Sequence, residues 1–138
     1  MLETVYADDK DDPIITNLAA LSQLGCRLDL DDFGTGYASI KSIRRFAVDR
    51  VKIDRTFIVD IATDTEQQQV VRTILSMAKH MGVSTLAEGV ETSEELSYLT
   101  TAGCEHAQGY VIGRPVSQAE ATDWLSARRT PEQAETAV

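Results

Sequence analysis

Residues 28–37 read Leu-Asp-Leu-Asp-Asp-Phe-Gly-Thr-Gly-Tyr, an apolar, strand-like run that ends in two adjacent carboxylates and a glycine-spaced turn. Successive residues of a strand point to opposite faces, so Asp31 and Asp32 cannot both project into one core. Both suit the end of a strand, because carboxylates beside a flexible Gly34-Thr35-Gly36 loop favour hard cations such as Mg²⁺. An ordinary polar turn is the alternative interpretation, since Asp and Gly are common turn residues.

The composition of the 138-residue chain is that of one ordinary soluble domain with a sizeable core. There are 22 acidic and 13 basic residues, giving a formal net charge of −9. This balance disfavours binding to a nucleic-acid polymer. An anionic small molecule can still bind where a metal bridges it to acidic groups.

Two further features bear on the compartment. Cys26 and Cys104 lie in apolar runs without metal-ligand spacing, which predicts buried free thiols in a reducing environment. The chain contains no apolar run that approaches a membrane span, and its N-terminus lacks the regions of a signal peptide. We therefore expect a cytoplasmic protein.

Helical and strand-like patterns alternate along the chain. Helices are expected after Pro13, around residues 40–46, over residues 65–81 and after the capping-box patterns that begin at Thr92 and Ser117. Strands are expected at residues 26–30, 50–54, 83–87 and 104–110. Alternation with short connections predicts an α/β fold with a parallel sheet covered by helices. Residues 128–138 are polar, lack periodicity and are expected to fray.

Polar side chains recur at the carboxyl ends of these strands, the edge at which α/β sheets and (β/α)₈ barrels assemble their chemistry. They are Asp31, Asp32, Lys52, Glu88 and Gln108. Carboxylates there can bind divalent metals, a lysine can orient a water, and a glutamine can hold a metal-bound water or a ligand oxygen. The occurrence of several such side chains at one edge of the sheet favours a functional site there.

Each position also has a purely structural interpretation. Lys52 can form a weak surface ion pair with Asp54. Glu88 and Glu91 can favour the N-terminus of the following helix electrostatically. Gln108 can be a turn residue before a glycine.

Two other motifs are excluded by their surroundings. Asp32-Phe33-Gly34 matches the metal motif of protein kinases, but no glycine-rich phosphate loop or His-Arg-Asp loop precedes it. The segment from Gly34 is not a dinucleotide fingerprint, because Ser39 stands where the third glycine is required.

Four motifs together resemble those of the EAL domain. They are Asp31-Asp32-Phe33-Gly34-Thr35-Gly36-Tyr37, Val51-Lys52-Ile53-Asp54-Arg55, Ala87-Glu88-Gly89-Val90-Glu91 and Gln108-Gly109-Tyr110. The resemblance spans about residues 2–126. It implies a bacterial, cytoplasmic phosphodiesterase domain on a modified (β/α)₈ barrel, which hydrolyses the signalling nucleotide cyclic-di-GMP to pGpG with two Mg²⁺ or Mn²⁺ ions.

The resemblance also implies roles for the polar side chains at the strand ends. Asp31 and Asp32 would be metal ligands, and Lys52 would position the catalytic water. Glu88 would be a metal ligand or general base, and Gln108 would contact the metal–water shell.

A second group of residues would support the site. Gly34, Thr35 and Gly36 belong to a loop that shapes the metal site and a dimer contact in this family. Glu3 would brace that loop, and Glu91 would support the site from behind. Ala38 departs from the family pattern, in which serine is usual at this position.

The Glu-Ala-Leu segment and the following asparagine ligand of the family are absent from the sequence. Residues 1–127 therefore resemble the C-terminal portion of an EAL domain, roughly half a (β/α)₈ barrel, followed by the tail at 128–138. Half a barrel has two open edges, which predicts a homodimer or pairing through an edge. We expect weak or no turnover by this chain alone. The alternative is a non-catalytic EAL-type module that binds cyclic-di-GMP or a protein partner.

Overall fold

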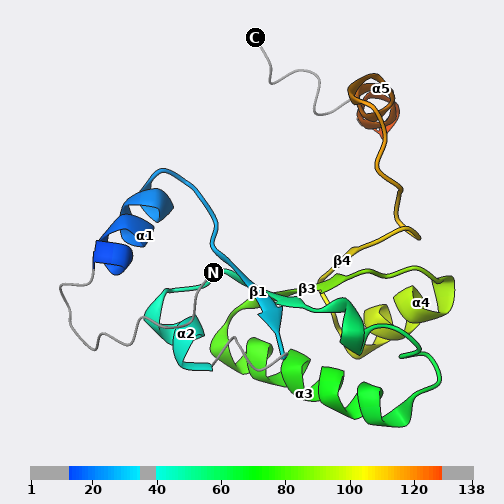
Figure 1. The fold of residues 1–138 in the computed structure, drawn as a ribbon, viewed down its shortest axis with the longest axis horizontal. Coiled ribbons are helices and arrows are strands. Elements are labelled where there is room, and N and C mark those ends of the chain that lie inside the picture. The colour runs from blue at the N-terminus through cyan, green and yellow to red at the C-terminus, as the bar shows by residue number, and fades with distance from the viewer. Residues whose placement is uncertain (1–12, 35–39, 129–138) are drawn as a thin grey trace.

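A computed structural model of the chain describes residues 13–34 and 40–128. The predictions for Glu3, Thr35, Gly36 and the tail fall outside these residues. The elements, in order, are α1 (Pro13–Gln23), β1 (Asp29–Phe33), α2 (Ile40–Arg45), β2 (Arg50–Ile53), η1 (Arg55–Phe57), α3 (Thr65–Met81), β3 (Ser84–Glu88), α4 (Ser93–Ala102), β4 (His106–Gln108) and α5 (Gln118–Arg128) (Figure 1).

The four strands form one sheet in the order β1-β2-β3-β4, and every neighbouring pair is parallel. The predicted α/β class and parallel sheet are confirmed. Each strand lies beside its successor in the chain, as in the wall of a (β/α)₈ barrel, where each connection advances by one strand. The carboxyl ends of all four strands consequently meet at one edge.

The first strand contains a β-bulge. Leu30 pairs with Val51 and Phe33 with Ile53, so two residues of β1, Asp31 and Asp32, stand opposite Lys52 alone. Asp32 has a φ of 52°, a left-handed conformation that aspartate tolerates better than most residues. The strand therefore runs beyond the aspartate pair, whereas residues 26–30 were predicted. A bulge depends on pairing with the next strand, which local sequence does not reveal.

Two glycines and a capping box define the ends of α3 and α4. Gly82 ends α3 in a left-handed conformation, and Gly103 does the same for α4. Thr92 and Glu95 form the predicted capping box of α4, with the Thr92 hydroxyl accepting from the Glu95 amide and the Glu95 carboxylate accepting from the Thr92 amide. In the chain, α3 lies between β2 and β3, and α4 lies between β3 and β4.

The core lies between the sheet and α3. Val51 and Ile53 of β2 are fully buried, and Val71 of α3 is buried with them. Ile58, directly after η1, is also fully buried and joins the same cluster. This core fixes the middle strands, and with them the side chains at their carboxyl ends.

Two helices stand away from the sheet in Figure 1, namely α1 and α5. No residue of α1 is buried, and Leu24, just after it, is 81% exposed. Trp124 and Leu125 of α5 are also exposed, Leu125 to 60%. Both helices form as predicted, but their apolar side chains have little of the described chain to pack against.

The cysteine prediction is partly wrong. Both thiols are free, but Cys26 is exposed and Cys104 only partly buried. Cys26 lies in the connector between α1 and β1, because the strand begins later than predicted. Among residues 13–34 and 40–128, no helix is long and apolar enough to cross a membrane.

Candidate functional site

Lys52 lies between two carboxylates at the ends of neighbouring strands. Its Nζ is 2.7 Å from Oδ1 of Asp31 on β1 and 2.8 Å from Oε1 of Glu88 on β3. The Lys52 and Glu88 side chains are 21% and 23% exposed, whereas Asp31 is 64% exposed. The structural interpretation of Lys52 as a partner of Asp54 is wrong. Asp54 instead accepts hydrogen bonds from Thr56.

The ion pairs set the charge states of this cluster. The hydrogen bond from Lys52 lowers the pKa of Asp31 below its usual value, although partial burial acts in the opposite direction. Partial burial acts to lower the pKa of Lys52, but the hydrogen bonds to Asp31 and Glu88 outweigh it and raise the pKa. At neutral pH Lys52 is therefore a protonated ammonium group. It acts as a hydrogen-bond donor and not as a base.

These two pKa shifts predict a stability plateau. The lowered pKa of Asp31 contributes stability that is present above its unfolded value of about 3.9 and is lost as the pH falls through the folded pKa. The raised pKa of Lys52 contributes stability that is present below about 10.4 and is lost as the pH rises through the folded pKa. Because Asp31 is largely exposed, its contribution should not exceed about 1 kcal/mol.

Asp31→Asn isolates the acid side of this plateau. Denaturant unfolding should find the variant less stable than the wild type near pH 7, and the difference should shrink as the pH falls below the unfolded value of about 3.9 and through the lowered folded pKa of Asp31. A difference that stays constant from neutral pH through this acid range would contradict the assignment of the Lys52 contact to Asp31.

Gln108 lies beside Glu88 across the sheet. The two residues are register partners in the β3–β4 pair, each the last of its strand. The Gln108 carbonyl accepts a hydrogen bond from Val90, at 3.0 Å, in the loop after β3. The structure thus brings Asp31, Lys52, Glu88 and Gln108 to one edge, with Asp32 in the bulge.

Glu91 makes a contact that the sequence did not predict. Its Oε1 lies 2.8 Å from a guanidinium nitrogen of Arg55, the first residue of η1. The N-terminus of α4 is satisfied by Glu95 instead, which accepts from the amides of Glu91 and Thr92.

Sequence reasoning also gave no role to Arg55, Phe57 or Gly89. The stem of Arg55 lies so close to Gly89 that a Cβ at the glycine would be 2.5 Å from its Cγ. Phe57 approaches Gly34 in the same way, with its Cε2 2.7 Å from the position of a Cβ. The sequence signal for these contacts was a glycine directly after each strand that carries acidic residues at its end. Gly34 follows β1 and Gly89 follows β3.

The donor set suits a divalent metal ion in its chemistry. Asp31, Asp32 and Glu88 offer the hard oxygen ligands that Mg²⁺ and Mn²⁺ prefer. Within residues 13–34 and 40–128, however, no three acidic, cysteine or histidine side chains are grouped closely enough to hold a metal ion. The described carboxylates therefore fit part of a metal site.

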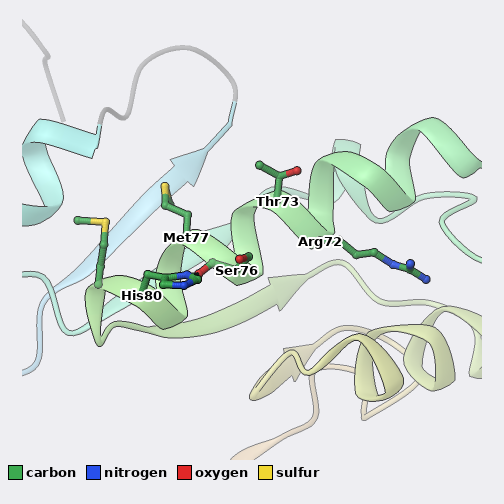
Figure 2. A pocket seen from close by; sticks show the side chains of 6 residues that line it. Arg72, Thr73, Ser76, Met77 and His80 are labelled. Atoms are coloured by element: carbon green, nitrogen blue, oxygen red, sulfur yellow. Dashed lines mark hydrogen bonds between the residues drawn. The ribbon is translucent and has the colours of Figure 1, made fainter.

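A separate hollow of about 560 Å³ lies on α3 and does not include the carboxylates (Figure 2). All its lining residues, from Arg72 to Met81, belong to this one helix. His80 is exposed there, with its Nδ1 2.6 Å from the Ser76 carbonyl oxygen. Nothing in this hollow combines carboxylates with a cation, so the strand-end cluster is the better candidate site.

Comparison with known proteins gives consistent matches. The family model of the EAL domain matches residues 1–115. The cyclic di-GMP phosphodiesterase NbdA of Pseudomonas aeruginosa is 40% identical over 118 residues, which are 86% of this chain and 15% of NbdA.

Solved structures agree with this match. The crystal structure of the EAL domain of Mycobacterium smegmatis DcpA superposes with a TM-score of 0.77 at 34% identity, covering 84% of this chain and 52% of that one. The manganese and cyclic-di-GMP complex of Klebsiella pneumoniae BlrP1 has a TM-score of 0.67 at 35% identity, covering 75% and 26% of the two chains.

The matches cover only part of each relative. The chain spans less than a fifth of the length of NbdA and about half of the DcpA domain structure. The neighbouring structures are TIM-like barrels, and the parallel four-stranded sheet corresponds to a portion of such a barrel. With the family model matching most of its length, this chain is a member of the EAL domain family.

Proposed function

We propose that this chain is the C-terminal portion of a cytoplasmic bacterial domain that hydrolyses cyclic-di-GMP to pGpG. Residues 1–127 would form that portion, and residues 128–138 a polar tail. The observation that supports the proposal most strongly is the position of Lys52 between Asp31 and Glu88. Named phosphodiesterase relatives and a relative in complex with cyclic-di-GMP add to it.

Each polar side chain at this edge has a proposed role. Asp31 and Asp32 would be metal ligands, and the bulge explains how adjacent residues of one strand can serve one site. Glu88 would be a ligand or general base. Gln108 would contact the metal–water shell beside Glu88.

The cofactor would be Mg²⁺ or Mn²⁺, and a bound divalent cation would polarise the phosphodiester and acidify a water. Asp31, Asp32 and Glu88 would hold it, together with ligands from outside this portion. Lys52 stays protonated, so it can orient a water or neutralise a phosphate oxygen by donating hydrogen bonds. Lys52 would consequently not be the general base, a role that Glu88 would take if it is not a metal ligand.

Support for the loop would come from Glu91 together with Glu3, Gly34, Thr35 and Gly36. Glu91 has a structural basis for this role in its ion pair with Arg55, since Arg55 also packs against the residue that follows Glu88. The other four are assigned by resemblance to the family.

The domain would be incomplete without further chain. β1 and β4 are the outer strands of the described sheet, and parallel strands at an edge offer unpaired backbone groups. Apolar side chains at Leu24, Trp124 and Leu125 are exposed as well. We therefore propose that this portion pairs through its open edge, with a second copy or with the remainder of a barrel, and that it turns over weakly or not at all alone.

Incubation with cyclic-di-GMP and Mg²⁺ or Mn²⁺, followed by chromatography for pGpG, tests the proposal. The expected result is slow, metal-dependent formation of pGpG that Glu88→Gln abolishes. The matched control is Glu94→Gln, which changes an exposed glutamate in the first turn of α4. pGpG formation that persists in Glu88→Gln would contradict the assigned site.

A non-catalytic module is the second candidate, because the described residues do not group three metal-binding side chains. It predicts cyclic-di-GMP binding in calorimetry without any pGpG. An absence of both binding and turnover would leave only the version in which the module binds a protein.

A further inference from the structure

The short helix η1 begins three residues after Lys52 and contacts the loops after both neighbouring strands. Its first residue, Arg55, packs against the loop after β3, and its last, Phe57, against the turn after β1. We propose that η1 sets the positions of the two carboxylate-bearing strand ends relative to Lys52, with Arg55 and Phe57 as positioning residues. The significance of these positions rests on the proposed function of the carboxylates.

Arg55 holds the loop after β3 by two contacts. A Cβ at Gly89 would lie 2.5 Å from Cγ and 2.7 Å from Cδ of Arg55, so the arginine stem lies directly against the glycine backbone. The guanidinium then reaches Glu91, at 2.8 Å. Because Gly89 follows Glu88, a shift of this contact would move the carboxylate that faces Lys52.

The same loop is held on its other side by β4. The amide of Val90 donates to the Gln108 carbonyl at 3.0 Å, and the Val90 carbonyl accepts from Val111 at 3.2 Å. Val90 is fully buried, and any side chain at Gly109 would overlap its main chain. β4 and the residues after it hold one side of this loop. The position of the other side therefore depends on its contact with Arg55.

Phe57 makes the corresponding contact with β1. A Cβ at Gly34 would lie 2.7 Å from Cε2 and 2.9 Å from Cζ of the ring, so the ring edge lies against the glycine. Gly34 is two residues after Asp32, and the intervening Phe33 is buried. The ring therefore limits how far the bulged end of β1 can move towards η1.

η1 is itself held firmly enough to serve as a reference. Asp54 caps it, accepting from the Thr56 amide at 2.9 Å and from the Thr56 hydroxyl at 2.5 Å. Ile58 directly after it is fully buried, and α3 packs against it. Both positioning residues thus belong to a short, capped helix that follows the strand of Lys52.

Zero-length carbodiimide cross-linking of the full chain tests this arrangement, since the reagent joins an amine to a carboxylate only when they touch. In the wild type, mass spectrometry should find Lys52 joined to Asp31 and to Glu88. Arg55→Ala, which removes both the stem and the guanidinium, should lower the Lys52–Glu88 product by about fivefold or more and leave the Lys52–Asp31 product within about twofold. Phe57→Leu should have the opposite selectivity.

Matched controls are Arg72→Ala and Phe46→Leu, which alter another exposed arginine and another partly buried phenylalanine away from the cluster. Both products should stay at wild-type levels in these controls. If Arg55→Ala does not fold, by circular dichroism, Glu91→Gln keeps the arginine stem and should still lower the Lys52–Glu88 product selectively.

Two results would overturn the proposal. One is an equal loss of both products in both positioning variants, which indicates general loosening. The other is wild-type yields of both products in both variants. The cross-links need neither metal nor nucleotide, so a failure of the chain to form pGpG would count against the proposed function and leave this test intact.

Discussion

Gly109→Ala is expected to lower the free energy of unfolding by about 3 kcal/mol. A Cβ at this position would overlap the main chain of Val90. Val90 is fully buried, and its main chain is hydrogen-bonded to the main chains of Gln108 and Val111. Neither backbone can yield easily, because the overlapping atoms belong to peptide groups and not to a flexible side chain. Urea unfolding measures the loss.

Gly113→Ala is the matched control. A Cβ at Gly113 would meet no atom within 4 Å, so the free energy of unfolding should change by no more than about 0.5 kcal/mol. Equal midpoints for Gly109→Ala and the wild type would mean that β4 and the loop after β3 are not packed as described.

Lys52→Met should have the largest effect on function. It removes the cation that both Asp31 and Glu88 contact, and any pGpG formation by the wild-type chain should fall by about 10²-fold or more. The methionine preserves most of the apolar stem, so the loss reports the ammonium group. Quantified pGpG release at equal protein concentration is the measurement.

The same variant has a stability signature that does not depend on turnover. At neutral pH the two carboxylates lose their shared partner, which should cost about 1 kcal/mol for this partly exposed cluster. Lys79→Met, in the last turn of α3, is the control and should change neither property. If Lys52→Met behaves like Lys79→Met, the lysine is a surface charge without a role in the site.

Local signals made much of the fold predictable. The bounds of α3, residues 65–81, follow from its helical pattern of apolar residues, and the capping box at Thr92 follows from spacing alone. Four alternating strands implied a parallel sheet, and its carboxyl edge implied where Lys52 and Glu88 would meet.

The remainder depended on contacts between segments distant in sequence. The bulge at Asp31 and Asp32 exists only against β2, and Arg55 and Phe57 contact loops that lie far from them in the sequence. The exposure of Cys26 follows from the late start of β1. Residue type and spacing carry no record of such pairings.

The bulge in β1 has a consequence for how sequences of this kind can vary in length. With Leu30 opposite Val51 and Phe33 opposite Ile53, the additional residue of β1 is absorbed between two fixed pairs. Deleting Asp32 would leave Asp31 opposite Lys52 and Phe33 opposite Ile53, so every other residue would keep its partner. The number of acidic side chains at this edge can therefore change by one while the pairing of β1 with β2 stays the same. The chemistry of the site and the register of the sheet can vary independently here.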